Sequence, residues 1–182
     1  MGKARINFMS AQQRAALATA VFAIAGIAGS FAAVDTWRAA WPCILFYAMI
    51  LWNDYHSIAY FSTVISSKKV SQVVIDAALV ILNIALAGFF REPKIFSAIG
   101  ALFFAVATLK YANELSMIDK PELLYRKIVV DIAGTIGFAF LLLANLFGQG
   151  NIAMPVEAVL FSIATIYLIL INPLYQPPQA LQ

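Results

Sequence analysis

Runs of about 20 consecutive apolar residues recur along the whole chain, and no other feature constrains its fold as strongly. An α-helix needs about 20 residues to cross the hydrocarbon core of a bilayer. Water is absent there, so each crossing segment must satisfy its own backbone hydrogen bonds, which a helix does. We therefore predict an all-α, polytopic integral membrane protein, folded as a compact bundle of about six transmembrane helices.

The composition agrees with this class. Hydrophobic residues make up 63% of the 182 residues and charged residues 12%, about half the charged fraction of an ordinary soluble domain. The formal net charge is +3, but the basic residues are scattered through tails, short loops and helix ends, which excludes a nucleic-acid partner. A single cysteine, Cys43, and a single histidine, His56, exclude an internal disulfide and a multi-cysteine or two-histidine metal site.

Short segments rich in glycine, proline and charge separate the apolar runs. We treat the chain as one transmembrane domain, 1–182, and interpret its first apolar run as a retained helix. The predicted spans are about 15–34, 41–65, 70–90, 95–112, 128–147 and 154–174.

The basic residues predict the orientation of these spans. With six spans and a cytoplasmic N-terminus, the inner side holds Lys3, Arg5, Arg14, Lys68, Lys69, Lys120, Arg126 and Lys127. The outer side holds Arg38, Arg91 and Lys94. Cytoplasmic loops are enriched in lysine and arginine, so we expect both termini inside and the protein in a plasma (inner) membrane.

The first span has small residues at four-residue spacing: Ala25, Gly29 and Ala33. Such a stripe lets two helix backbones approach closely. Packing within the bundle and self-association between subunits both explain it, so a homo-oligomer and a membrane-protein partner stay open beside the lipid bilayer.

Two later segments resemble each other, "QVVIDAA" at 72–78 and "KIVVDIA" at 127–133. Each follows a basic segment, and each places an aspartate, Asp76 or Asp131, near the start of a span. The pattern favours a parallel duplication of a helical hairpin, with the second and third spans repeated as the fourth and fifth. Chance similarity between apolar helices is the alternative.

Charged and polar side chains inside the spans are the candidate site. A charge at the centre of a bilayer costs at least about 2.5–3.5 kcal/mol on insertion scales and needs a partner, water or a neutral state. Asp54 lies near the middle of the second span, and we expect it to face a wet interior close to Lys110 or His56. The candidate ion- or substrate-binding residues are Asn53, Asp54, His56, Asp76, Lys110, Glu114 and Asp131.

Structural interpretations compete for several of them. Asp131 with Lys127, and Lys110 with Glu114, could each be a simple ion pair one helical turn apart. His56 could be a hydrogen-bonded structural residue, and Asp76 could be interfacial.

The sequence favours two functions. The first is an ion or proton channel, or an ion-coupled carrier of a small solute, with an interior polar site. The second is a non-catalytic subunit or assembly partner of a larger membrane complex. A lipid-modifying enzyme ranks third, because no catalytic, phosphate-binding or metal-binding motif is present. We therefore predict no catalytic residues, no metal and no cofactor.

Overall fold

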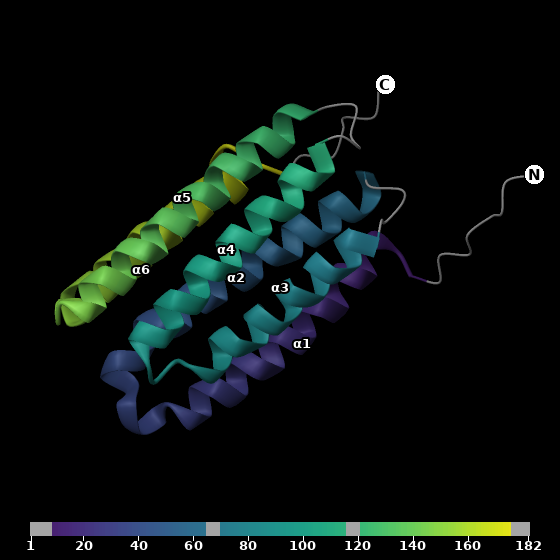
Figure 1. The fold of residues 1–182 in the computed structure, drawn as a ribbon. Coiled ribbons are helices and arrows are strands. Elements are labelled where there is room, and N and C mark those ends of the chain that lie inside the picture. Colours follow the sequence, from purple (N-terminus) through teal and green to yellow (C-terminus); the bar gives the residue numbers. More distant parts are fainter. Residues whose placement is uncertain (1–8, 65–69, 116–120, 176–182) are drawn as a thin grey trace, which may run out of the picture.

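The chain folds into six long helices in the part that the computed structural model describes, residues 9–64, 70–115 and 121–175 (Figure 1). No strand occurs in these ranges. The helices are α1 (Ala11–Ala32), α2 (Trp37–Val64), α3 (Val70–Gly88), α4 (Pro93–Glu114), α5 (Pro121–Leu146) and α6 (Gly150–Ile166). A 3₁₀ turn, η1 (Val34–Thr36), joins α1 to α2, and a π-helical turn, η3 (Tyr167–Ile171), continues α6.

Local sequence signals set several helix ends. Ser10 caps α1 in a capping box, in which its side chain accepts from the Gln13 amide while the Gln13 side chain accepts from the Ser10 amide. Pro93 opens α4, where its missing N–H costs nothing. After α5, Gly148 adopts a φ of 77°, a left-handed conformation that suits glycine and lets the chain turn into α6.

The predicted bounds are correct to within a few residues except at the start of α5. The charged segment "PELLYRK" (121–127), predicted to be loop, forms the first turns of that helix. Proline suits a first helical turn and the other six residues are of types compatible with a helix, so polarity alone did not mark a break here. α6 also begins earlier than predicted, at Gly150.

Five of the six helices are long and apolar enough to cross a membrane, namely α1, α3, α4, α5 from Leu124, and α6 with η3. The exception in this described part is α2. With 28 residues, it is about 42 Å long at 1.5 Å per residue, which exceeds the hydrocarbon thickness. What it lacks is apolarity, because Asn53, Asp54 and His56 interrupt its middle.

The helices form a closed ring. Each packs against the next in the order α1, α2, α6, α5, α4, α3, and α3 returns to α1. α2 and α4 also meet across the ring. Figure 1 shows all six running along a common direction, so that α1 begins at one end of the bundle, here called the near end, and finishes at the far end.

The ring order bears on the proposed hairpin duplication. α4 and α5 pack together extensively, whereas α2 and α3 make few contacts. A duplicated hairpin should keep the relation between its two helices, and here the two relations differ. The similarity of 72–78 to 127–133 therefore does not extend to how the helices pair.

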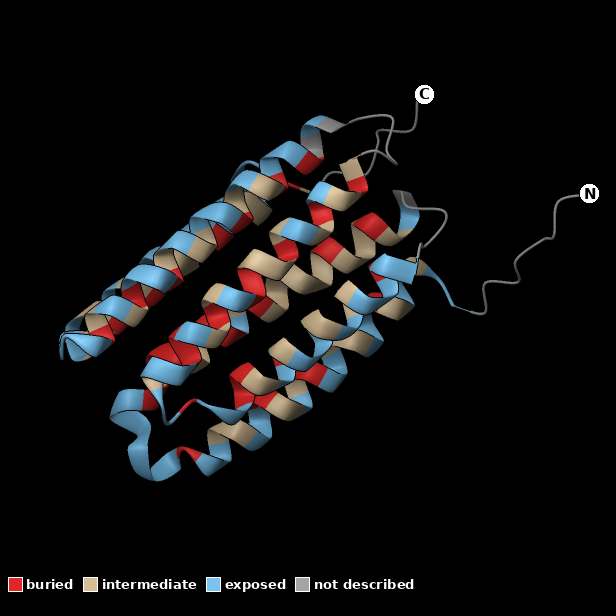
Figure 2. Ribbon diagram, viewed as in Figure 1, coloured by how far each residue is buried: buried red, intermediate tan, exposed pale blue. Residues whose placement is uncertain are grey.

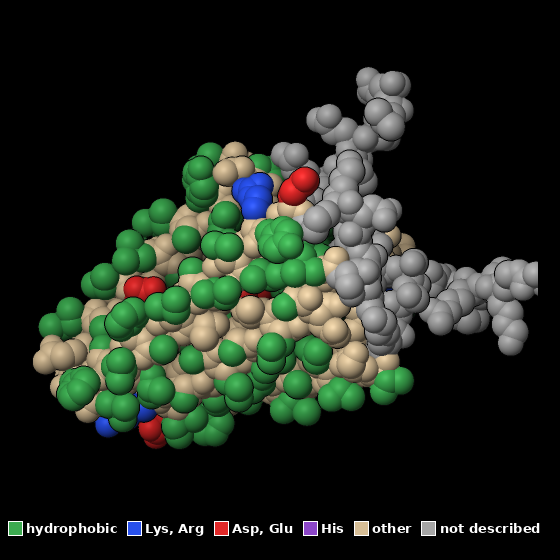
Figure 3. Space-filling view, turned by 45° about the horizontal axis from the view of Figure 1, so that its top comes forward, with side chains coloured by type: hydrophobic (Ala, Val, Ile, Leu, Met, Phe, Trp, Pro, Cys, Tyr) green, Lys and Arg blue, Asp and Glu red, His purple; other side chains and the backbone are tan. Residues whose placement is uncertain are grey.

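The surface and the interior differ as expected for a lipid-facing bundle. Buried positions line the inward sides of the helices (Figure 2), and one face is covered by hydrophobic side chains with charged groups at only a few places (Figure 3). Large exposed apolar side chains occur on every long helix, for example Phe31, Ile81 and Phe140. An aqueous surface rarely carries such a continuous apolar area.

Two hydrophobic clusters fill the interior. The larger holds Phe46, Phe90, Phe96 and Phe138, whose ring centroids lie 5.0–6.3 Å apart in tilted pairs. The smaller cluster lies toward the near end of the bundle, where Ala107, Tyr111 and Leu124 surround Phe61.

The small-residue stripe of α1 packs within the bundle. A Cβ on Gly29 would lie 2.1 Å from the carbonyl oxygen of Ala87 in α3, and one on Gly26 would lie 2.5 Å from the ring of Tyr47. Ala33 is fully buried. The glycines are therefore required for the close contact of α1 with α3 and α2.

At the far end, an ion pair joins two connections. Arg91, between α3 and α4, donates to the carboxylate of Asp35 in η1. The guanidinium lowers the pKa of the Asp35 carboxyl. Both side chains are exposed, so this ion pair adds little stability. It shows that the two connections lie at the same end of the bundle.

Candidate functional site

A cavity of about 270 Å³ lies between α1, α2, α3, α4 and α5. Its apolar wall draws on both hydrophobic clusters, with Phe103 and Phe104 from the larger and Phe61 from the smaller. Its polar and charged lining comes mainly from α2 to α5: Asn53, Asp54, Ser57, Ser62, Gln72, Asp76, Asn83, Lys110, Tyr111, Glu114, Lys127 and Asp131. All the predicted site residues except His56 therefore line one cavity.

Asp54 is bound by a neutral donor. The side-chain amide of Asn83 in α3 donates to Asp54 Oδ2 at 2.8 Å. Within the described ranges, no lysine, arginine or histidine lies within ion-pair distance of this carboxylate. The expectation that Lys110 or His56 would be its close donor is therefore wrong, because Lys110 is engaged elsewhere and His56 lies on another side of the helix.

The two lysines of the cavity each pair with an aspartate. Lys110 Nζ in α4 lies 2.8 Å from Asp76 Oδ1 in α3, with both side chains mostly buried. Lys127 pairs with Asp131 one turn along α5, and this pair is almost fully buried. The Lys110–Glu114 pair predicted as an alternative is not the contact that holds Lys110. Glu114 itself is 3% exposed and lines the cavity.

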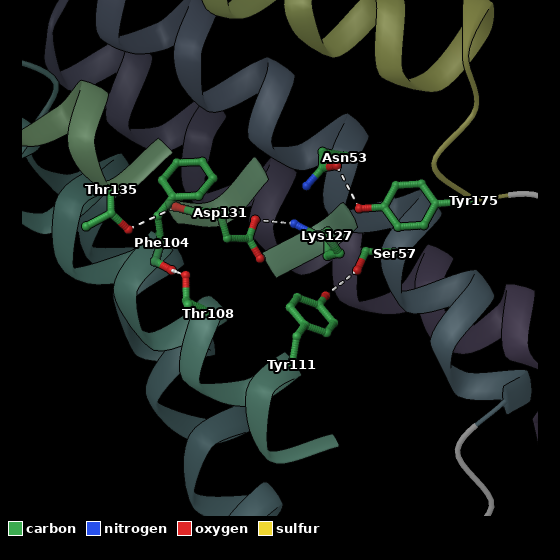
Figure 4. Close-up of polar contacts among 9 residues, drawn as sticks. All are labelled: Asn53, Ser57, Phe104, Thr108, Tyr111, Lys127, Asp131, Thr135 and Tyr175. Carbon is green, nitrogen blue, oxygen red and sulfur yellow. Dashed lines mark hydrogen bonds and ion pairs between the residues drawn. The ribbon is translucent and has the colours of Figure 1, made fainter. Parts of the chain in front are cut away.

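Tyr111 connects the two lysines with α2. Its ring centroid lies 5.1 Å from Lys127 Nζ and 5.7 Å from Lys110 Nζ, within the range of a cation–π contact. Its hydroxyl lies 2.5 Å from Ser57 Oγ. Figure 4 shows this tyrosine to one side of the Lys127–Asp131 pair, with its hydroxyl directed toward Ser57.

A residue beyond the last predicted span, Tyr175, contacts one of the residues that line the cavity. After η3 the chain returns toward α2, and the Tyr175 hydroxyl donates to Asn53 Oδ1 at 2.9 Å (Figure 4). The same ring lies parallel to His56, at 9° and 6.5 Å between centroids, and contacts Phe61 edge-on. No sequence signal showed that the π-turn would bring Tyr175 to the site.

His56 belongs to this aromatic group and not to the cavity. It contacts Tyr55 and Trp52 as well as Tyr175. It lies two positions after Asp54, which is about 200° of rotation around the helix. The two side chains therefore point to different sides of α2, and the predicted joint site of Asp54 and His56 does not form.

Asn83 Oδ1 and Asp131 Oδ2 are buried acceptor atoms in the cavity wall that have no hydrogen-bond partner among the described residues. Buried acceptors left unsatisfied are costly and rare in folded proteins. The lining also holds more acidic than basic side chains, with Asp54, Asp76, Glu114 and Asp131 against Lys110 and Lys127. Both features favour a ligand that donates hydrogen bonds or carries positive charge.

The acidic groups are spread around the cavity. No three of the aspartate, glutamate, histidine and cysteine side chains in the described ranges gather closely enough to hold a metal ion. The arrangement therefore suits a diffuse negative field rather than one tight coordination point.

Comparison of the chain with protein families, with curated proteins and with solved structures finds no match. Any proposal for the function therefore rests on the arrangement of the residues around the cavity.

Proposed function

We propose that the protein moves cations across a membrane, as a channel or a cation-coupled carrier, and that the cavity around Asp54 is its binding site. In this proposal α2 is the sixth membrane span. Its polar middle is tolerated because it faces the ring interior, where intramembrane carboxylates most often serve ion pathways.

The observation that carries the proposal is that the hydrogen-bond donor to Asp54 is a neutral group. The other two aspartates of the cavity have lysine partners, whereas Asp54 accepts from the amide of Asn83. A carboxylate held by a neutral donor keeps its charge available for a cation that enters the cavity. The unpaired acceptors of Asn83 and Asp131 in the same wall support this use.

Replacing Asp54 with asparagine tests the proposal. The variant keeps the size of the side chain but removes its charge, so we expect cation flux into liposomes to fall at least about tenfold, the effect of roughly 1.4 kcal/mol. Protons and K⁺ serve as the ions, followed with an internal pH dye and a K⁺ indicator. Expression and elution volume should stay unchanged.

Glu92→Gln is the matched control, because it removes one exposed carboxylate at the start of α4. Wild-type flux in Asp54→Asn would refute the proposal. Loss of yield or dissociation of a complex in Asp54→Asn, without a change in flux per folded protein, would favour the assembly-subunit alternative instead.

Orientation is a separate prediction. The described basic residues Arg14, Arg126 and Lys127 belong to the near half of the bundle and Arg38, Arg91 and Lys94 to the far half; the other inner-side residues lie outside the described residues. We expect the near end to be cytoplasmic. In a Cys43→Ser background, Glu92→Cys and Gln149→Cys should react with an impermeant maleimide from outside intact cells.

Arg126→Cys, on the exposed side of α5 near its start, should react only after the cells are opened. Reaction of position 92 only in opened cells would contradict the six-span orientation.

A further inference from the structure

A second cavity, of about 290 Å³, lies between α2, α4, α5 and α6. Its wall is mostly apolar, with the aromatic rings of Phe46, Phe104, Phe138 and Phe161. Its polar residues are Asn53, Glu157 and Thr165. None of the predicted site residues other than Asn53 belongs to it.

The two cavities follow one another along the bundle. On α2, the first cavity is lined from Asn53 toward the near end and the second from Asn53 toward the far end, at Phe46. On α5, the first uses Lys127 and Asp131, and the second uses residues from Val130 onward to Phe138. Asn53 and Phe104 line both, so these two side chains form a shared wall.

Glu157 has an unusual environment for a carboxylate. It lies inside the candidate span Gly150–Ile171 and is partly buried. Within the described residues it makes no hydrogen bond and no ion pair, in contrast to Asp76 and Asp131. A carboxylate at membrane depth without a partner is expected to bind a cation.

The carboxylate of Glu157 lies against α5. Small residues of α5 line this side, and a Cβ on Gly137 would lie only 3.1 Å from Glu157 Oε1. A carboxylate beside several aromatic faces is the combination that binds organic ammonium groups, because the ring faces attract a cation that has lost its water. The cavity volume limits the ligand to a small one.

We propose that the cavity at Glu157 is a second binding site on the transport path, that it takes a small organic cation of the ammonium type, and that Asn53 and Phe104 separate it from the Asp54 site. This inference rests on the proposed function, because it adds a station beyond Asp54. The ring of Phe104 lies against Gly134, on which a Cβ would approach it to 2.7 Å, and packs with Phe138 and Phe161.

Equilibrium dialysis of the purified full-length protein with radiolabelled tetramethylammonium tests the inference. We expect two bound equivalents per chain in the wild type and one in Glu157→Gln. Glu122→Gln removes an exposed carboxylate near the start of α5 and should retain two. Equal stoichiometry in the wild type and Glu157→Gln would overturn the second site.

Gly137→Ala provides an independent variant in case Glu157→Gln fails to fold. It keeps the carboxylate but places a methyl group against it, so one of the two equivalents should bind at least about fivefold less tightly. Unchanged affinity for both equivalents would overturn the proposal. Elution volume and the unfolding midpoint show that each variant is folded.

Flux measured in parallel separates this inference from the proposed function. Unchanged binding in Glu157→Gln together with Asp54-dependent flux would overturn the Glu157 site and leave the proposed function standing. Two equivalents, one of them lost in Glu157→Gln, without K⁺ or proton flux in any preparation would support the site and refute the proposed function.

Discussion

Lys127→Met is expected to lower the free energy of unfolding by about 3–5 kcal/mol, the effect of leaving one buried charge without its partner. Lys127 and Asp131 are 3% and 0% exposed at their side chains, and they pair with each other across one turn of α5. Asp131 already has one oxygen without a hydrogen-bond partner among the described residues. Removing the ammonium group therefore leaves a carboxylate that neither lipid nor the cavity wall compensates. Unfolding by SDS in mixed micelles, followed by tryptophan fluorescence, measures the change.

Arg126→Met is the matched control, because it removes a neighbouring positive charge that is exposed. It should change the free energy of unfolding by no more than about 0.5 kcal/mol. Adding Asp131→Asn to Lys127→Met removes the unpaired charge and should restore much of the loss. Equal stability of Lys127→Met and Arg126→Met would show that the buried pair does not stabilise the fold.

Gly29→Ala is expected to be the second large effect, a loss of about 1–3 kcal/mol in the free energy of unfolding. The added methyl group would fall 2.1 Å from the backbone oxygen of Ala87, a contact that cannot be relieved by a side-chain rotation. α1 and α3 must move apart, and the close packing that holds membrane helices together is reduced along both. The same SDS titration reports the loss.

Gly88→Ala is the control for Gly29→Ala, because Gly88 is also helical and is the last residue of α3. A Cβ there meets nothing within 4 Å, so the better helix propensity of alanine should leave stability unchanged or raise it by up to about 1 kcal/mol. A Gly29→Ala variant as stable as Gly88→Ala would show that α1 does not depend on this close approach.

The sequence was sufficient for the helices and for most of the cavity lining. Apolar runs with charged breaks located six helices, since the cost of an exposed backbone in lipid leaves little choice of secondary structure. Charged side chains inside the spans were chosen as the candidate site because a charge in lipid is costly, and Asp54, Asp76, Lys110 and Asp131 line one cavity.

The sequence was insufficient for the partners of these side chains. Helical spacing shows which residues share a face, but the partner of Asp54 depends on which helices are neighbours and at what height. Lys110 was expected beside Asp54 and is instead held by Asp76, because α3 and α4 pack together in the ring. His56 was grouped with Asp54 from their closeness in sequence, although the helix separates them by more than half a turn.

The closed ring also determines when the protein can be completed. α2 lies between α1 and α6, and Asn53 obtains its hydrogen bond from Tyr175, 122 positions later in the chain. A ribosome adds roughly 5–20 residues per second, so α2 lacks its last neighbour until the chain has been made as far as Tyr175. During that interval quality-control proteases can recognise Asn53, Asp54 and His56, because α6 does not yet pack against α2. A nascent chain stalled before α6 should therefore be degraded faster than one stalled after Tyr175.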